Sequence, residues 1–223
     1  MPREQMHIGN AAGFSVDRMD VGGPVADSLI ASGKPAALFY ETLAERTLAI
    51  AQRERRANPE KGYTPDLAGF VGPVLKRCVE NGVPIIGNFG AANPMGAAKR
   101  LHALAKTQGI SGLRVAVVDG DDLRENIRGL QTQQWGEEKP LDLANTEILA
   151  ANVYMGSQPI ADALDQDPHV VVTGRVTDSA LTLGPLMQHF GWAADDWDKM
   201  AAGVLAGHCL LYTSDAADES SSV

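Results

Sequence analysis

Carboxylate and guanidinium side chains stand directly after several apolar runs of this sequence. Asp119, Asp121 and Asp122 follow one run, and Glu41 and Arg175 follow two others. A carboxyl group whose pKa is raised by burial can serve as a general acid or base near neutral pH. A guanidinium group is suited to clamping a carboxylate or a phosphate. The pattern therefore indicates acid–base chemistry on an anionic small molecule, with the four carboxylates as catalytic candidates.

Amides and glycines occupy the same kind of position and could hold the substrate. Asn10, Asn88 and Asn93 are suited to orienting a substrate or polarising a carbonyl group. Helix amino termini after Asn93 and Thr177 would favour an anion. The predicted substrate-binding residues are Gly9, Asn10, Asp17, Asn88, Asn93, Thr173, Gly174, Arg175 and Asp178.

Structural roles for these residues stay open at this point. Any one of the aspartates could simply cap a helix, and Arg175 could pair with a structural acid. The cluster of Asp119, Asp121 and Asp122 could bind a divalent cation, but the spacing fixes no further ligand, so we assign no metal site. We find no Ser–His or Cys–His pair in a recognisable nucleophile motif. Four histidines are expected on the surface: His7, His102, His169 and His189.

The elements that would position these residues are those of an α/β protein. The apolar runs 83–86, 115–118 and 170–172 are continuous rather than alternating, as in parallel strands buried on both faces. We predict an open, mostly parallel sheet with helices on both faces. In such a sheet, ligands bind beyond the carboxyl ends of the strands. The glycine loop 9–17 lacks the three-glycine spacing of a dinucleotide site.

The coarse pattern predicts six strands and seven helices. The strands are expected at 6–8, 35–41, 83–86, 115–118, 148–154 and 170–172. The helices are expected at 25–31, 43–56, 66–80, 95–108, 159–164, 181–190 and 195–208, the sixth interrupted at Gly184–Pro185. A polar segment, 129–142, is expected to be an excursion from the sheet.

Composition limits the classes of partner. The chain has 223 residues, a net charge of −9 and two cysteines. The negative charge argues against nucleic acid or an anionic membrane as the main partner, and two cysteines are too few for a disulfide framework. We therefore expect a cytoplasmic protein whose partner is a small molecule.

The C-terminal residues differ in character from the rest of the chain. Residues 209–218 have the sequence that a transposase-type sequencing adapter would encode. We therefore expect residues 1–208 to form a single α/β domain that is incomplete at its C-terminus, and 209–223 to be a non-native tail.

Several blocks of the chain resemble the N-terminal part of the acyclic terpene utilisation family (AtuA-like proteins). The most specific block joins Thr173-Gly-Arg-Val-Thr-Asp-Ser179 to Gly191-Trp192 and Asp195-Asp-Trp197. The other matching blocks are 8–14 with Asp17, 43–45, 62–63 with Asp66, 88–94, 117–123 and 202–208. Ser15–Val16 and Ala91 depart from the family pattern.

The resemblance implies a bacterial catabolic protein linked to citronellol or geraniol breakdown, a pathway that handles acyl-CoA thioesters. It implies no settled reaction. Two interpretations therefore stay open: an enzyme acting on an acyl-CoA or a carboxylated terpenoid, and a non-catalytic ligand-binding or scaffolding subunit. A homo-oligomer and a further C-terminal domain are also left open, and the sequence specifies no cofactor.

Overall fold

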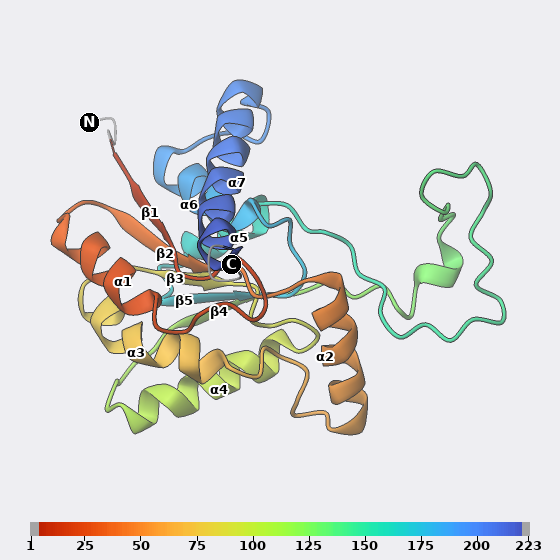
Figure 1. Ribbon diagram of the computed structural model, residues 1–223, viewed down its shortest axis with the longest axis horizontal. Helices are drawn as coiled ribbons and strands as arrows, with labels where there is room; N and C mark the ends of the chain where they lie inside the picture. The colour runs from red at the N-terminus through yellow and green to blue at the C-terminus, as the bar shows by residue number, and fades with distance from the viewer. Residues whose placement is uncertain (1–4, 220–223) are drawn as a thin grey trace.

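The chain folds around one five-stranded sheet in which every strand pairing is parallel. The computed structural model describes residues 5–219 (Figure 1). The strand order is β1-β2-β3-β5-β4. The strands are β1 (His7–Asn10), β2 (Ala36–Tyr40), β3 (Ile85–Gly87), β4 (Val115–Val118) and β5 (Val170–Thr173). This architecture confirms the fold class expected from the continuous apolar runs.

Helices cover both faces of the sheet. They are α1 (Gly22–Ala31), α2 (Glu45–Ala57), α3 (Leu67–Glu80), α4 (Pro94–Thr107), α5 (Gln158–Leu164), α6 (Ala180–Phe190) and α7 (Trp197–Glu219), with a 3-10 turn η1 (Ile127–Gly129). Helices α1, α3 and α4 lie on one face, and α5, α6 and α7 lie on the other (Figure 1). Helix α2 instead stands at one end of the sheet, after β2.

The connections between strands create a switch in direction between β3 and β5. The chain advances through β1, β2 and β3 with its helices on one face, and α4 carries it to β4 on that face. It then returns to β5 through α5 on the opposite face, as right-handed crossovers require. Consequently the loops after the neighbouring strands β3 and β5 leave toward opposite faces. Ligand sites of open α/β sheets form in the crevice at such a point.

Alternate residues of the strands feed two separate cores. Leu38, Tyr40 and Ile85 pack with α1, α3 and α4. Phe39 and Ile86 point the other way, toward α5 and α6. Because both faces are buried, the strands carry apolar residues at consecutive positions.

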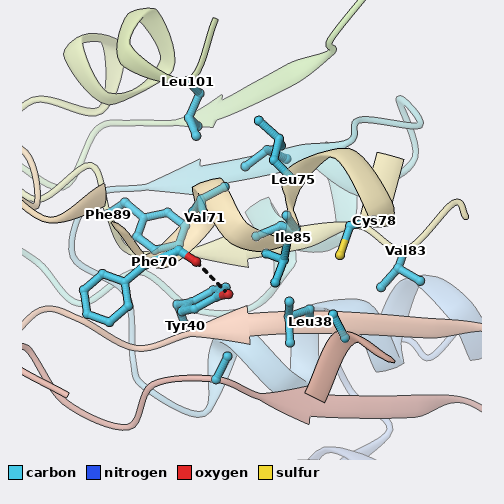
Figure 2. Packing of buried hydrophobic residues seen from close by; sticks show 14 of the residues in the cluster. Leu38, Tyr40, Phe70, Val71, Leu75, Cys78, Val83, Ile85, Phe89 and Leu101 are labelled. Atoms are coloured by element: carbon cyan, nitrogen blue, oxygen red, sulfur yellow. Dashed lines mark hydrogen bonds between the residues drawn. The ribbon is translucent and has the colours of Figure 1, made fainter. Parts of the chain in front are cut away.

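Tyr40 anchors the first core and offers a simple test of it. Its hydroxyl donates a hydrogen bond of 3.1 Å to the carbonyl oxygen of Phe70, and its ring packs against Phe70 and Phe89 (Figure 2). We expect Tyr40→Phe to lower the free energy of unfolding by about 1 kcal/mol, the usual contribution of one hydrogen bond. Urea denaturation followed by circular dichroism measures this difference. A variant as stable as the wild type would contradict the assigned bond.

Two predicted features of secondary structure are wrong. The segment 148–154 forms no strand; it contributes only an isolated bridge from Asn152 to Asp122, because it runs along the rim of the sheet. Helix α6 continues through Gly184–Pro185. A β-carbon at Gly184 would lie 2.5 Å from Ile160 Cγ2, so glycine there permits close packing of α6 on α5 rather than a break.

The remaining chain between β4 and α5 is a long excursion. Residues 130–150 project from the body of the molecule beyond α2 (Figure 1), as the polar segment 129–142 suggested.

Helix α7 runs past residue 208 without interruption. Within residues 5–219, we find no helix with the length and apolar character needed to cross a membrane.

Candidate functional site

The loops at the carboxyl ends of the strands are joined into one rim by hydrogen bonds. Each loop contacts the loop of the neighbouring strand, in the order in which the strands lie in the sheet. The contacts are Glu41 N–H to Ala12 O (2.8 Å), Thr42 N–H to Asn88 Oδ1 (2.7 Å), Gly90 N–H to Thr173 O (3.0 Å) and Arg175 N–H to Asp121 Oδ2 (2.8 Å). The polar loops that follow separate strands in the sequence therefore form a single surface.

Gly90 lies where the loop after β3 touches the loop after β5. A β-carbon there would lie 2.5 Å from Thr173 O and 2.7 Å from Pro94 Cα, both main-chain atoms. We expect Gly90→Ala to lower the free energy of unfolding by about 1–3 kcal/mol, as overpacking does elsewhere. Gly23→Ala is the matched control, because a β-carbon there meets nothing within 4 Å. Equal urea midpoints for the two variants would contradict the close approach at Gly90.

Glu41 is buried at the end of β2, with only 6% of its surface exposed. Its Oε1 accepts a hydrogen bond of 2.7 Å from the Asn88 side chain and one of 2.9 Å from the main-chain N–H of Leu43. Asn88 is in turn fixed by Thr42, whose N–H and hydroxyl both donate to Asn88 Oδ1. The position of the carboxyl group is therefore set by neighbours in the loops after β2 and β3.

Burial raises the pKa of Glu41 from its ordinary value of 4.5 to about 7. Hydrogen bonds from Asn88 and Leu43 favour the charged form but do not offset the burial. The charge of Asp178 raises the pKa further, and that of Arg175 lowers it. A carboxyl group that is partly protonated at neutral pH can both donate and accept a proton.

Arg175 is the second buried charge, with 4% of its surface exposed. Its Nη1 donates a hydrogen bond to Leu43 O and lies 4.0 Å from Glu41 Oε1. Its Nη2 lies 3.1 Å from Asp178 Oδ1 and 3.7 Å from Glu45 Oε1. Of these acids, Glu45 and Asp178 are the exposed ones, at 74% and 43% of their side chains. An incoming anion could therefore displace them into solvent.

One nitrogen of Arg175 is unsatisfied. Nε is buried and has no hydrogen-bond partner among residues 5–219. The guanidinium carbon lies 4.1 Å from the centre of the Tyr154 ring, a cation–π contact. Buried donors are almost always paired in folded proteins. A buried guanidinium with an unused donor is therefore a marker of a binding site.

Arg175 and Tyr154 line a cleft of about 470 Å³ between α2 and the excursion after β4. Leu48 and Ala49 form its wall on the helix, and Leu143 and Ile148 line it from the excursion. Asn152 also lines it, and the buried Oδ1 of Asn152 likewise has no partner within the described chain. The lining is thus largely apolar, with Glu45 and Glu147 as its acids and with unpaired buried atoms on Arg175 and Asn152.

The three aspartates after β4 lie in different environments. Asp121 is buried, accepts hydrogen bonds from Arg175 N–H and Asn152 Nδ2, and has a pKa raised by burial. For Asp122 burial acts to raise the pKa, but hydrogen bonds from Arg124 and Gln52 outweigh it and lower the pKa below its ordinary value. Asp119 is exposed and accepts a hydrogen bond from Gly120 N–H.

Most other predicted site residues hold the loops in shape. Asn10 accepts from Ala12 N–H and donates to Leu210 O, and Asp17 accepts from Gly13 N–H at 2.7 Å. Asn93 caps α4 by accepting from Gly96 N–H.

Predicted residues at the ends of β1 and β5 also pack closely. The hydroxyl of Thr173 donates to Gly174 O, and Gly174 lies against Asp121, where a β-carbon would be 2.2 Å from Oδ1. Gly9 packs on α1, where a β-carbon would be 2.5 Å from Val25 Cγ1. Of the predicted residues, the structure brings Glu41, Asn88 and Arg175 together, with Asp178 beside them.

Some features of the site were missed in the sequence. Tyr154 and Asn152 fell within the wrongly predicted strand, and only their place between two polar loops hinted at a role. His189, expected on the surface, is 7% exposed, and its Nε2 lies 3.1 Å from Gln5 O. Over residues 5–219, no three His, Cys, Asp or Glu side chains gather in a way that could hold a metal ion.

Comparison with known proteins supports the resemblance seen in the loops. The model of the family described as acyclic terpene utilisation family protein AtuA matches residues 6–211. Searches of curated proteins and of solved structures found no significant match. The matched range includes all five strands and every loop of the rim. This chain therefore belongs to the acyclic terpene utilisation (AtuA) family.

Proposed function

We propose that this protein binds an amphiphilic anion, such as a carboxylated terpenoid or its acyl-CoA thioester, in the cleft beside Arg175. The observation that carries the proposal is the buried guanidinium of Arg175, whose Nε has no partner within the described chain and which lines that cleft. An acidic group of the ligand would pair with this guanidinium, taking the place of Asp178 and Glu45.

The shape of the cleft favours a ligand with a hydrocarbon portion. A volume of about 470 Å³ is within the range of small-molecule sites. Its walls are formed by Leu48, Leu143 and Ile148 on either side. An acyl chain would lie along these walls while its polar end reaches Arg175 and Asn152. Membership of the acyclic terpene utilisation family provides a context in which such acids occur.

We further propose that Glu41 is the general acid or base. Its pKa of about 7 makes both protonation states available at neutral pH. Asn88 and Leu43 hold its Oε1, so the carboxyl group is oriented before a ligand arrives. Asp119, Asp121 and Asp122, the other candidates, are better suited to holding the loop after β4.

A non-catalytic ligand-binding subunit is the second candidate. It is favoured by the fact that Asp121 and Asp122 are already engaged by hydrogen bonds within the protein. A binding subunit would be stabilised by its ligand without converting it. In that case the Glu41→Gln variant would still bind the ligand, and neither the variant nor the wild type would form a product.

Calorimetric titration with octanoate, octanol and octanoyl-CoA tests the binding proposal. We expect octanoate or its thioester to bind and octanol, which lacks the charge, to bind at least tenfold more weakly. Arg175→Lys should weaken binding of the anion, because it loses the guanidinium fork. Arg114→Lys is the matched control, since Arg114 pairs with Asp167 at the opposite end of β4. Equal binding of octanoate and octanol would contradict the proposal.

A further inference from the structure

A second cavity lies on the other side of α2. Its volume is about 150 Å³, and Thr47, Ile50 and Ala51 line it from the helix. The cleft beside Arg175 is instead lined by Leu48 and Ala49 of the same helix. At 3.6 residues per turn these two sets point in opposite directions. The two spaces are therefore separated by the body of α2.

The second cavity is small and mostly apolar. Leu43, Ala51 and Ala91 are buried within it, and the more exposed Val16 and Ile50 stand at its mouth. An apolar cavity of about 150 Å³ is large enough to hold benzene. The space therefore suits a hydrocarbon group of about six carbon atoms or fewer.

The polar groups of the cavity indicate which hydrogen-bonding group a ligand bound there would have. Thr42 and Thr64 are buried, with their hydroxyl oxygens 3.2 Å apart. The Thr42 hydroxyl donates to Asn88 Oδ1, so the Thr64 hydroxyl is left to donate to Thr42. The oxygen of Thr64 then keeps the capacity to accept a hydrogen bond.

The charge of the lining disfavours anions in this second cavity. The charged side chains that line it are Glu54 and Asp66, both acids, with no cation among them. The first cleft also contains two acids, Glu45 and Glu147, but it has the cation Arg175 beside them. A carboxylate placed in the second cavity would be repelled by both acids. An uncharged ligand with one hydrogen-bond donor would avoid this repulsion and could donate to the oxygen of Thr64.

We propose that this cavity is a binding site for a small uncharged alcohol of about six carbon atoms or fewer, whose hydroxyl donates to Thr64. The site is distinct from the anion cleft. A chain of hydrogen bonds through Thr64, Thr42 and Asn88 would connect its occupant to Glu41. A negatively charged ligand and an uncharged ligand could thus bind on the two sides of α2 at the same time.

Amide chemical-shift mapping with three probes tests this site on the full chain. Cyclopentanol has five carbons and a hydroxyl, cyclopentane lacks the hydroxyl, and cyclopentanecarboxylate carries a charge. We expect cyclopentanol to shift the amide signals of Thr42, Thr64 and Ala91 in a saturable manner. Cyclopentane should bind about fivefold more weakly, as loss of one hydrogen bond implies. Cyclopentanecarboxylate should leave these signals unchanged.

Matched variants on the two faces of α2 locate the binding. Ile50→Phe enlarges a residue at the mouth of the second cavity and should weaken cyclopentanol binding at least tenfold. Ala49→Phe also introduces a phenylalanine, on the opposite face of α2, and should leave that binding unaltered. Thr64→Val preserves shape and should reduce affinity about fivefold, to that of cyclopentane.

Three results would overturn the assignment: no saturable shift with cyclopentanol, equal shifts with the carboxylate, or binding that survives Ile50→Phe unchanged. Ala49→Phe also separates this site from the anion cleft, because Ala49 lines only that cleft of the two. It should leave cyclopentanol binding intact whether or not the anion proposal holds.

Discussion

Arg175→Met is expected to lower the free energy of unfolding by about 3–5 kcal/mol at pH 8, the usual cost of removing one partner from a buried charge pair. Arg175 is 4% exposed and supplies a donor to Leu43 O and a positive charge 4.0 Å from Glu41. Methionine fills a similar space but leaves the Leu43 carbonyl without its donor and the Glu41 carboxylate without a cation. The loss should be smaller at pH 5, where Glu41 is protonated and needs no cation.

Urea denaturation at the two pH values measures this difference. Arg175→Lys is the companion variant, since it retains the charge and should lose less stability than methionine. Arg114→Met controls for loss of an exposed cation, because its partner Asp167 has 93% of its side chain exposed. An Arg175→Met variant as stable as Arg114→Met would contradict the role given to the buried guanidinium.

Glu41→Gln should have the opposite effect and stabilise the protein at pH 8 by about 2–3 kcal/mol. The pKa of Glu41 is about 7 in the folded state, above its ordinary value of 4.5. Between these values the folded protein holds a proton that the unfolded chain has released. The stability that Glu41 contributes is therefore full below pH 4.5 and is lost as the pH rises through 7.

The size of the effect follows from the same pKa difference. Each pKa unit corresponds to about 1.4 kcal/mol, so the difference between 4.5 and about 7 corresponds to about 3 kcal/mol. Glutamine resembles the protonated acid at every pH and avoids this loss.

Melting temperatures of wild type and Glu41→Gln between pH 5 and 8 test the prediction. The two should differ least near pH 5, and the variant should melt about 5–10 °C higher at pH 8. A smaller slope should persist in the variant, because burial also raises the pKa of Asp121. Parallel pH profiles for the two proteins would show that Glu41 titrates normally.

The sheet could be predicted from sequence because its strands are buried on both faces. Runs such as Val115–Val118 are apolar at every position, and their spacing leaves room for a crossover helix between most pairs. The gathering of the polar loops at one rim then follows from parallel pairing alone. The strand order was not predictable, since it depends on which helices pack on which face.

The individual roles within the rim were harder to predict. Asp121 and Glu41 both follow a strand and look alike in the sequence. Only the fold shows that Asp121 holds Arg175 and Asn152, whereas Glu41 lies beside the guanidinium with a pKa of about 7. Tyr154 was missed because Ile148, Leu149 and Val153 around it imitate a strand, although they line or flank a cleft.

A carbon-13 NMR titration of the glutamate side-chain carboxyl groups, with and without octanoate, tests the central claim most directly. If Glu41 and Arg175 form one anion-binding acid–base pair, a single resonance that is absent from Glu41→Gln should titrate near pH 7. Octanoate should move that titration to higher pH, because it places a negative charge beside Glu41. Titration of every glutamate near 4.5, or a Glu41 signal that octanoate leaves unchanged, would contradict the account.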